Sequence, residues 1–283
     1  MLKVAFIPFE PKLGKVSDNI ESMASQVLEF SRPKPNVILF PELASSGYLM
    51  ESLTYECSVT VDDPIWSPLW EASLQTGAEI ILGACLKTET GIKNGALVIR
   101  NGEPLFQYEK IYLPTYGMFD EARYFTPGTR LGVYEGFLGK TGLLICEDAW
   151  HGVLPYSLFA AGVSALVVLS ASPARGFSAN GQEPASILHW EKMLSTYSAS
   201  YGYQVLYVNR SGSEDGVAFS PRASYSIHGE IVQSHKENTP VIMDVNHAVE
   251  RFSKYGNPAQ NENWALNEKL LKQAHSFRFP GSV

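Results

Sequence analysis

The sequence has few cysteines and no recognisable metal-binding pattern. Its three cysteines, Cys57, Cys85 and Cys146, are widely spaced and form no CxxC pair. The six histidines show no HExxH or Cys/His ligand spacing, so we expect neither a metal nor another cofactor. An odd number of isolated cysteines is typical of reduced thiols in a cytosol rather than of a disulfide framework. This pattern indicates a cytoplasmic protein.

Long apolar runs and blocks of like charge are also missing. The apolar stretch at residues 163–171 is too short to span a bilayer, and the N-terminus reaches Glu10 before a signal-peptide core can form. The formal net charge is 22 − 29 = −7, with no clustered basic face for phosphate binding. We therefore expect a soluble protein that acts on a small molecule and binds neither nucleic acid nor membrane.

No linker rich in Pro, Gly and Ser interrupts the chain, and no internal repeat is evident. We expect a single domain over residues 1–283, in which residues 246–283 form a polar C-terminal tail with one short helical stretch at 265–274. Short β-branched runs alternate with amphipathic ones, and some strands are joined as hairpins. This alternation predicts an α/β fold with about eleven strands in one or two sheets and about five helices outside them.

The hydrophobic periodicity predicts where these elements lie. The expected strands are residues 3–8, 36–40, 79–85, 96–100, 105–109, 131–134, 141–145, 165–169, 204–209 and 241–245, with a hairpin over 224–234. The expected helices are one that Ser17 caps and that Pro33 and Pro35 end, then 65–75, 153–161 and 183–201. Hairpin turns are expected at Asn101-Gly102 and His228-Gly229.

Three polar residues stand where apolar strands end. Glu42 follows the run 37–41, Lys110 follows 104–109, and Cys146 follows 141–145. Taken singly, the cysteine is more often inert core filling, and the two charged residues are more often solvated. Together they supply a thiol, a carboxylate base and a cation, which are the parts needed for nucleophilic acyl transfer.

The segments around these residues resemble the signatures of the nitrilase superfamily, the carbon–nitrogen hydrolases. The matching segments are 40–43 (FPEL) with 46–48 (SGY), 108–114 (YEKIYLP), 119–125 (FDEARYF), 144–148 (LICED) and 209–212 (NRSG). The resemblance runs from Val4 to about Val245. It implies a four-layer α-β-β-α sandwich, a fold that commonly pairs into homodimers, and we expect a homodimer or a multiple of it.

The resemblance also implies a role for each matching residue. Cys146 would be the nucleophile, Glu42 the general base and later the acid, and Lys110 the oxyanion stabiliser together with the backbone N–H of Glu147. Glu121 matches the second glutamate of the family, which positions the lysine, although pairing with a neighbouring arginine on the loop surface is an alternative. The implied reaction is hydrolysis of a non-peptide amide bond through a cysteine thioester.

Within the superfamily, three segments look most like the glutaminase domains of glutamine-dependent NAD synthetases. They are 113–121 (LPTYGMFDE), 146–150 (CEDAW) and 170–173 (SASP). The counterparts of Tyr116, Trp150 and Ser172 border the glutamine pocket there, although simple aromatic packing also explains the first two. Arg175 follows a strand end, where a guanidinium can bind a substrate carboxylate. A solvent-exposed loop arginine is the alternative.

Several alternatives stay open at the level of sequence. The NAD synthetases carry a second, ATP-using domain, whereas this chain ends at Val283. We therefore expect a free-standing amidase, a glutaminase-type subunit that supplies ammonia to a separate partner, or an N-carbamoyl-amine hydrolase. A Cys–His hydrolase with His151 as base and a non-enzymatic binding module are further rivals. The Cys-Glu-Asp context resembles amidases more than nitrilases.

Overall fold

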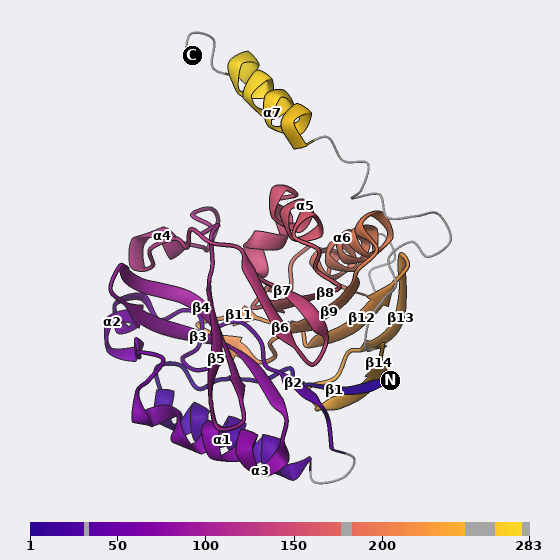
Figure 1. Cartoon of the computed structure of the whole chain (residues 1–283). Coiled ribbons are helices and arrows are strands. Elements are labelled where there is room, and N and C mark those ends of the chain that lie inside the picture. Colours follow the sequence, from indigo (N-terminus) through magenta and orange to yellow (C-terminus); the bar gives the residue numbers. More distant parts are fainter. Residues whose placement is uncertain (31–33, 177–182, 247–263, 279–283) are drawn as a thin grey trace. The chain divides into compact units, whose positions relative to one another are not determined.

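The computed structural model describes residues 1–30, 34–176, 183–246 and 264–278. The chain divides into two units, Met1–Val249 and Glu250–Val283. The first unit contains two six-stranded sheets packed face to face, with helices on the outer face of each (Figure 1). This is the α-β-β-α sandwich that the family resemblance implies. Among the described residues, every helix is too short or too polar to cross a bilayer.

The first sheet is built mainly from the N-terminal half of the chain. Its strand order is β14-β1-β2-β3-β4-β5, and only β1, β2 and β3 run parallel. The strands are β1 (Leu2–Phe6), β2 (Val37–Leu39), β3 (Glu79–Thr88), β4 (Gly91–Arg100), β5 (Glu103–Glu109) and β14 (Val241–Val245). Helices α1 (Val16–Glu29) and α3 (Ser67–Thr76) cover its outer face (Figure 1).

The second sheet has the order β13-β12-β9-β8-β7-β6. Its strands are β6 (Gly132–Gly136), β7 (Gly139–Ile145), β8 (Ala165–Ser170), β9 (Gln204–Asn209), β12 (Arg222–Ile227) and β13 (Glu230–His235). Helices α5 (Val153–Ala160) and α6 (Ala185–Tyr201) lie on its outer face (Figure 1). The central strands β7, β8 and β9 are parallel, so their carboxyl ends meet at one edge.

The remaining elements are short. They are the turns of 3-10 helix η1 (Glu51–Leu53), η2 (Pro64–Trp66) and η3 (Cys146–Trp150), the helices α2 (Thr54–Cys57) and α4 (Glu121–Tyr124), and the hairpin of β10 (Ser213–Glu214) and β11 (Val217–Ala218). The second unit contains α7 (Trp264–Arg278), which is longer than the stretch predicted at 265–274.

Burial explains why the long strands form where they do. The side chains between the two sheets, such as Val4, Ile81, Leu143 and Val167, form one apolar cluster. A second cluster joins the first sheet to α1 and α3. Strand β8 reads ALVVLS and is buried along its whole length, because a central parallel strand is covered on both faces.

Most predicted elements are present, with boundaries shifted by a few residues. The two hairpin turns are confirmed, since Asn101 and His228 have φ of 55° and 53° and a glycine follows each. The predicted cap by Ser17 is wrong: α1 begins at Val16, and the Ser17 hydroxyl faces Glu21 one turn later. Pro33 lies outside the described residues, as do 247–263 and 279–283 of the predicted tail.

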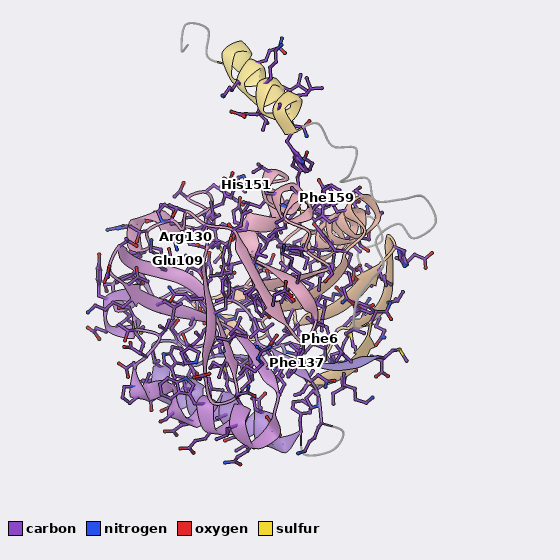
Figure 2. The ribbon with its side chains drawn as sticks, viewed as in Figure 1. Phe6, Glu109, Arg130, Phe137, His151 and Phe159 are labelled. Atoms are coloured by element: carbon purple, nitrogen blue, oxygen red, sulfur yellow. The ribbon has the colours of Figure 1, made fainter. Side chains whose placement is uncertain are left out.

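A buried carboxylate joins the two sheets at the end opposite the strand-end residues. Glu79 on β3 accepts hydrogen bonds from the hydroxyl of Tyr134 (2.8 Å) and from the backbone N–H of Phe137 (3.3 Å), both from the β6–β7 hairpin. Figure 2 shows Phe137 far from His151, which lies five residues after Cys146. Burial raises the pKa of Glu79, so the charged form of this carboxylate depends on these hydrogen-bond donors for its stability.

Replacing Tyr134 by phenylalanine removes one of those donors and leaves the ring in place. We expect this change to lower the free energy of unfolding by about 1–3 kcal/mol, the cost of leaving a buried acceptor short of a partner. Urea denaturation of the wild type and of Tyr134→Phe checks this. A variant as stable as the wild type would contradict the assignment of Glu79 as a bridge between the sheets.

Candidate active site

The residues that follow β2, β5 and β7 converge at one end of the sandwich. The side chains of Glu42 and Lys110 are completely buried, and Lys110 Nζ lies 2.7 Å from Glu42 Oε1. Their charges also act on the thiol of Cys146. The segment carrying Glu42 lies close against β3, where a Cβ on Gly83 would stand 2.5 Å from Glu42 Cα. Only glycine permits this approach.

Lys110 lies between two carboxylates. Its ammonium group donates to Glu42 Oε1 and to Glu121 Oε1, each at 2.7 Å. Burial alone would lower the pKa of Lys110, but the charges of Glu121 and Glu42 outweigh this effect and hold the pKa well above its usual value. Lys110 is therefore a fixed cation. Arg123, the alternative partner for Glu121, faces Asp120 at 3.7 Å instead.

Two further side chains bind the same carboxylates, and the sequence did not single them out. Asn94 on β4 donates from Nδ2 to Glu42 Oε1 (2.8 Å) and to Glu121 Oε2 (3.3 Å). Tyr48 donates its hydroxyl proton to Glu121 Oε1. Buried polar groups are normally paired, and here the pairing fixes the orientation of both carboxylates. The segment 46–48 was noted only as part of a motif, and no pattern pointed to Asn94.

The environment of Glu121 makes this site sensitive to pH. Burial raises the pKa of Glu121 to about 7, because Lys110 offsets only part of this effect and the charge of Glu42 adds to it. The unfolded value is about 4.3. Between these two pKa values, the folded state therefore binds more protons than the unfolded state. The contribution of Glu121 to stability is complete below the unfolded pKa and is lost as the pH rises through about 7.

Replacing Glu121 by glutamine should remove this pH dependence and retain the shape of the side chain. We expect the wild type to lose about 1–3 kcal/mol more unfolding free energy than Glu121→Gln between about pH 5 and about pH 7.5. Urea denaturation of both proteins at the two pH values gives the difference directly. Equal losses would show that Glu121 titrates in the folded protein much as it does in the unfolded chain.

Cys146 is placed at a sharp turn where β7 passes into η3. Its φ is 43°, in the left-handed region that a residue other than glycine rarely adopts. The hydroxyl of Ser170 donates to its sulfur at 3.4 Å. Burial raises the pKa of the thiol well above its usual value, and the charge of Glu42 raises it further. The resting thiol therefore holds its proton and requires a base to remove it.

Asp148 fixes the turn that presents Cys146. Its Oδ1 accepts from the backbone N–H groups of Ile111 (3.0 Å) and Tyr112 (2.9 Å). Its Oδ2 accepts from the hydroxyl of Tyr108 (2.8 Å) and from the backbone N–H of Ile145 (3.2 Å). One buried carboxylate thus ties the turn after β7 to the segment after β5. The relative position of Cys146 and Lys110 depends on it.

Glu147 follows the candidate nucleophile and has two side-chain partners. Its Oε2 accepts from the hydroxyl of Tyr116 at 2.7 Å, and its Oε1 lies 3.4 Å from His151 Nε2. The ring of His151 stacks on Tyr112 with the centroids 3.5 Å apart. The imidazole that a Cys–His mechanism would use is thus engaged with Glu147 and Tyr112.

The predicted substrate-binding residues fall into two groups. Tyr116 packs edge-on against Phe119, and the guanidinium of Arg175 lies 5.1 Å from the centre of the same ring. These side chains form a continuous rim beside Glu147. Arg175 is exposed, and the described residues offer it no ion-pair partner.

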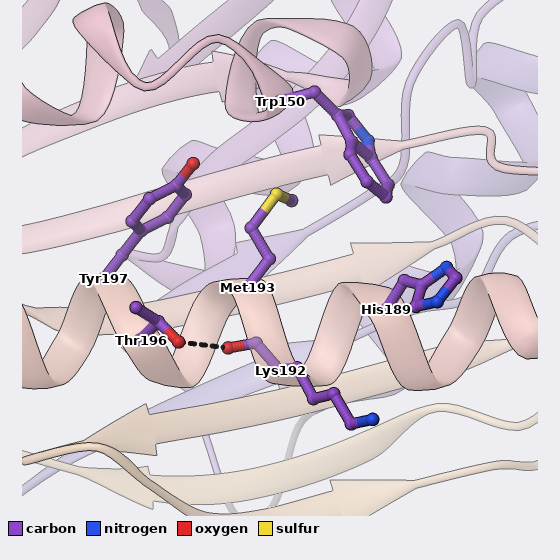
Figure 3. Close-up of a pocket in the computed structure, with 6 residues that line it drawn as sticks. All are labelled: Trp150, His189, Lys192, Met193, Thr196 and Tyr197. Atoms are coloured by element: carbon purple, nitrogen blue, oxygen red, sulfur yellow. Dashed lines mark hydrogen bonds between the residues drawn. The ribbon is translucent and has the colours of Figure 1, made fainter.

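Ser172 and Trp150 are held differently. The backbone of Ser172 is clamped by Asn209, which accepts from its N–H at 2.8 Å and donates to its carbonyl at 3.0 Å. Trp150 packs edge-on against Trp190 and lines a surface hollow of about 470 Å³ above α6 (Figure 3). The indole of Trp150 thus faces α6, which agrees with aromatic packing, the alternative to a place at the substrate pocket.

Comparison with known proteins agrees with this geometry. The family model described as carbon-nitrogen hydrolase matches residues 3–252. The glutamine-dependent NAD(+) synthetase of Acinetobacter baylyi is 31% identical over 223 residues, which cover 77% of this chain and 38% of that protein. The synthetase of Thermotoga maritima is 29% identical, with 77% and 37% covered. This chain therefore spans about two fifths of the length of these relatives.

Solved structures show the same fold. The glutamine-dependent NAD+ synthetase of Acinetobacter baumannii matches with a TM-score of 0.72 and 27% identity, over 89% of this chain and 49% of that one. An amidase of the nitrilase superfamily from Nesterenkonia matches with a TM-score of 0.76 and 18% identity, over 95% and 97%. The predicted resemblance is confirmed. The chain belongs to the carbon–nitrogen hydrolase family and is a hydrolase of carbon–nitrogen bonds.

Proposed function

We propose that the protein hydrolyses an amide through a thioester on Cys146 and releases ammonia or an amine. One observation carries this proposal: a thiol at a strained strand end stands beside a buried carboxylate–ammonium pair. A thiol that keeps its proton needs a base, and of the two carboxylates whose charges act on the thiol, Glu42 and Glu121, Glu42 has the larger effect. A developing oxyanion needs a fixed positive charge, which Lys110 provides.

In the first half of the reaction, Glu42 accepts the proton of Cys146 while the sulfur attacks the amide carbon. Lys110 has three N–H donors, and the two glutamates occupy two of them. The third, together with the backbone N–H of Glu147, would stabilise the oxyanion. Glu42 then passes its proton to the leaving nitrogen, so that the C–N bond breaks and the thioester remains.

In the second half, water replaces the amine. Glu42, now ionised again, removes a proton from the water, and the resulting hydroxide attacks the thioester carbon. The same oxyanion donors act on this second tetrahedral intermediate. Its collapse breaks the C–S bond, releases the carboxylic acid and returns the proton to Cys146. One carboxylate thus serves both halves.

The charges at the rim favour a substrate that carries both signs. Glu147 presents a carboxylate directly after the nucleophile, and Arg175 presents a guanidinium beside Phe119. An amino acid with a side-chain amide places an ammonium and a carboxylate at the end remote from that amide. The names of the relatives, glutamine-dependent NAD(+) synthetases, agree with this chemistry. We propose a glutamine-like ω-amide as the substrate.

Ammonia release from a panel of compounds tests the proposal. The panel contains glutamine and asparagine, simple aliphatic amides, N-carbamoyl amines and nitriles. We expect the highest kcat/KM with an ω-amide of an amino acid, and we expect Arg175→Gln to raise KM for that substrate more than for a neutral aliphatic amide. A higher kcat/KM with a nitrile or with a carbamoyl amine would contradict the proposed substrate class.

A second candidate is the supply of ammonia to a synthetase reaction. The similarity to glutamine-dependent NAD(+) synthetases favours it, because those relatives are named as synthetases that depend on glutamine, which carries a side-chain amide. Glutamine labelled with ¹⁵N in its amide distinguishes the two functions in a mixture with an ammonia-using NAD synthetase. Preferential transfer of the label in the presence of excess unlabelled ammonium would indicate direct supply. Complete dilution of the label would indicate a free-standing amidase.

A further inference from the structure

The ends of β7 and β8 bring a second hydroxyl-bearing residue to the thiol. The two strands run parallel, with Ile145 opposite Leu169 in the register, so Cys146 and Ser170 are the next residues of each. Ser170 is completely buried, and its Oγ lies 3.4 Å from the sulfur of Cys146. In the sequence, Ser170 stood out only as part of the segment 170–173 (SASP).

The residue after Ser170 binds the other partner in the proton transfer. The backbone N–H of Ala171 donates to Glu42 Oε2 at 2.8 Å. The residue after that, Ser172, is clamped through its backbone by the side chain of Asn209. The end of β8 is therefore fixed in place, and it presents one donor to the nucleophile and the next donor to the base.

We propose that Ser170 is a further catalytic residue, whose hydroxyl directs the thiol proton of Cys146 toward Glu42. This inference rests on the proposed function. A thiol carries one proton, and its sulfur is a weak acceptor. When the Ser170 hydroxyl donates to the sulfur, the S–H bond points away from that donor and is free to point toward the carboxylate.

The same hydroxyl stabilises the thiolate once the proton has moved to Glu42. Hydrogen bonds to a charged acceptor are stronger than those to a neutral one, so the interaction tightens as the charge develops. The donation by Ser170 lowers the pKa of the Cys146 thiol and works against burial and the charge of Glu42, which raise it. Ser170 thus favours the ionised nucleophile without supplying a charge of its own.

Alkylation of Cys146 by iodoacetate, which contains no amide bond, measures this effect without a substrate. The titratable groups that interact electrostatically with the thiol are Glu42, Lys110, Glu121, Tyr48, Tyr116 and Tyr207. None of them is changed in the variants below. The rate is followed on the peptide that contains Cys146, so slow reaction at Cys57 or Cys85 does not enter the measurement.

Three substitutions separate the hydroxyl from the shape of the side chain. Ser170→Ala removes the hydroxyl. The side chains of Ser170→Thr and Ser170→Val have the same shape, but only threonine keeps the hydroxyl. We expect alkylation near neutral pH to be about tenfold slower in Ser170→Ala than in the wild type, with the pH profile displaced to higher pH. We expect Ser170→Thr to react several times faster than Ser170→Val.

Ser226→Ala is the matched control, because Ser226 is an equally buried serine of the same sheet on β12. We expect it to react like the wild type. Equal rates for the threonine and valine variants, or a wild-type rate in Ser170→Ala, would overturn the role of Ser170. Since alkylation needs no amide, failure to find amide hydrolysis would overturn the proposed function and leave this test valid.

Discussion

Replacing Glu42 by glutamine should lower kcat/KM for amide hydrolysis by about a hundredfold to ten-thousandfold, the range expected when a general base is lost. The glutamine keeps the size of the side chain, and its amide oxygen can accept from Lys110 and Asn94 as Glu42 Oε1 does, but its NH2 group cannot accept from the backbone N–H of Ala171 as Glu42 Oε2 does. It also loses the capacity to accept a proton from a thiol whose pKa is raised by burial. Thioester formation and thioester hydrolysis should both slow.

Rapid-quench kinetics on one amide separate the two steps. Glu109→Gln is the matched control, since Glu109 ends the strand β5 and its carboxylate lies 3.3 Å from Lys93, a lysine outside the Lys110 cluster. We expect near-normal turnover both from this control and from His151→Ala. An active Glu42→Gln together with an inactive His151→Ala would overturn the mechanism in favour of a Cys–His pair.

The second large effect should follow the replacement of Lys110 by methionine. Methionine fills a similar volume but leaves the buried carboxylates Glu42 and Glu121 without the cation that lies 2.7 Å from each. Breaking a buried ion pair on one side costs about 3–5 kcal/mol of stability. We also expect kcat to fall about a hundredfold or more, the range for loss of one oxyanion donor.

The two consequences are measured separately, by urea denaturation and by kcat where the variant remains folded. Lys93→Met is the matched control, because Lys93 is also a buried lysine and donates to the carbonyl of Pro127 at 3.0 Å. We expect Lys93→Met to lose stability and to keep kcat within a few-fold of the wild type. A Lys110→Met protein with normal kcat would show that Lys110 has only a structural role.

The strand ends were predictable because they depend on local patterns. A buried parallel strand reads as a continuous apolar run, and the polar residue that interrupts the run marks where the sheet edge opens. Glu42, Lys110 and Cys146 each stand at such a point. The turns at Asn101 and His228 were predictable for a similar reason, since each adopts a positive φ before a glycine.

The partners of these residues were not predictable from local patterns. Asn94 lies 52 residues from Glu42 in the chain and reaches it because β4 packs beside β3. Ser170 reaches Cys146 through the register of β7 and β8, which no single segment encodes. The packing of Trp150 against Trp190 depends in the same way on how α6 lies over its sheet. Such contacts arise only when distant segments pack together.

The covalent intermediate gives the most direct test of the proposed chemistry. A slowly hydrolysed amide is mixed with the wild type, quenched in acid and examined by intact-protein and peptide mass spectrometry, with Cys146→Ala as the comparison. We expect a mass increase equal to the acyl group of the substrate, located on the peptide that contains Cys146 and missing from the variant. An acyl group on Cys57 or Cys85, or amide turnover by Cys146→Ala, would contradict the assignment of Cys146 as the nucleophile.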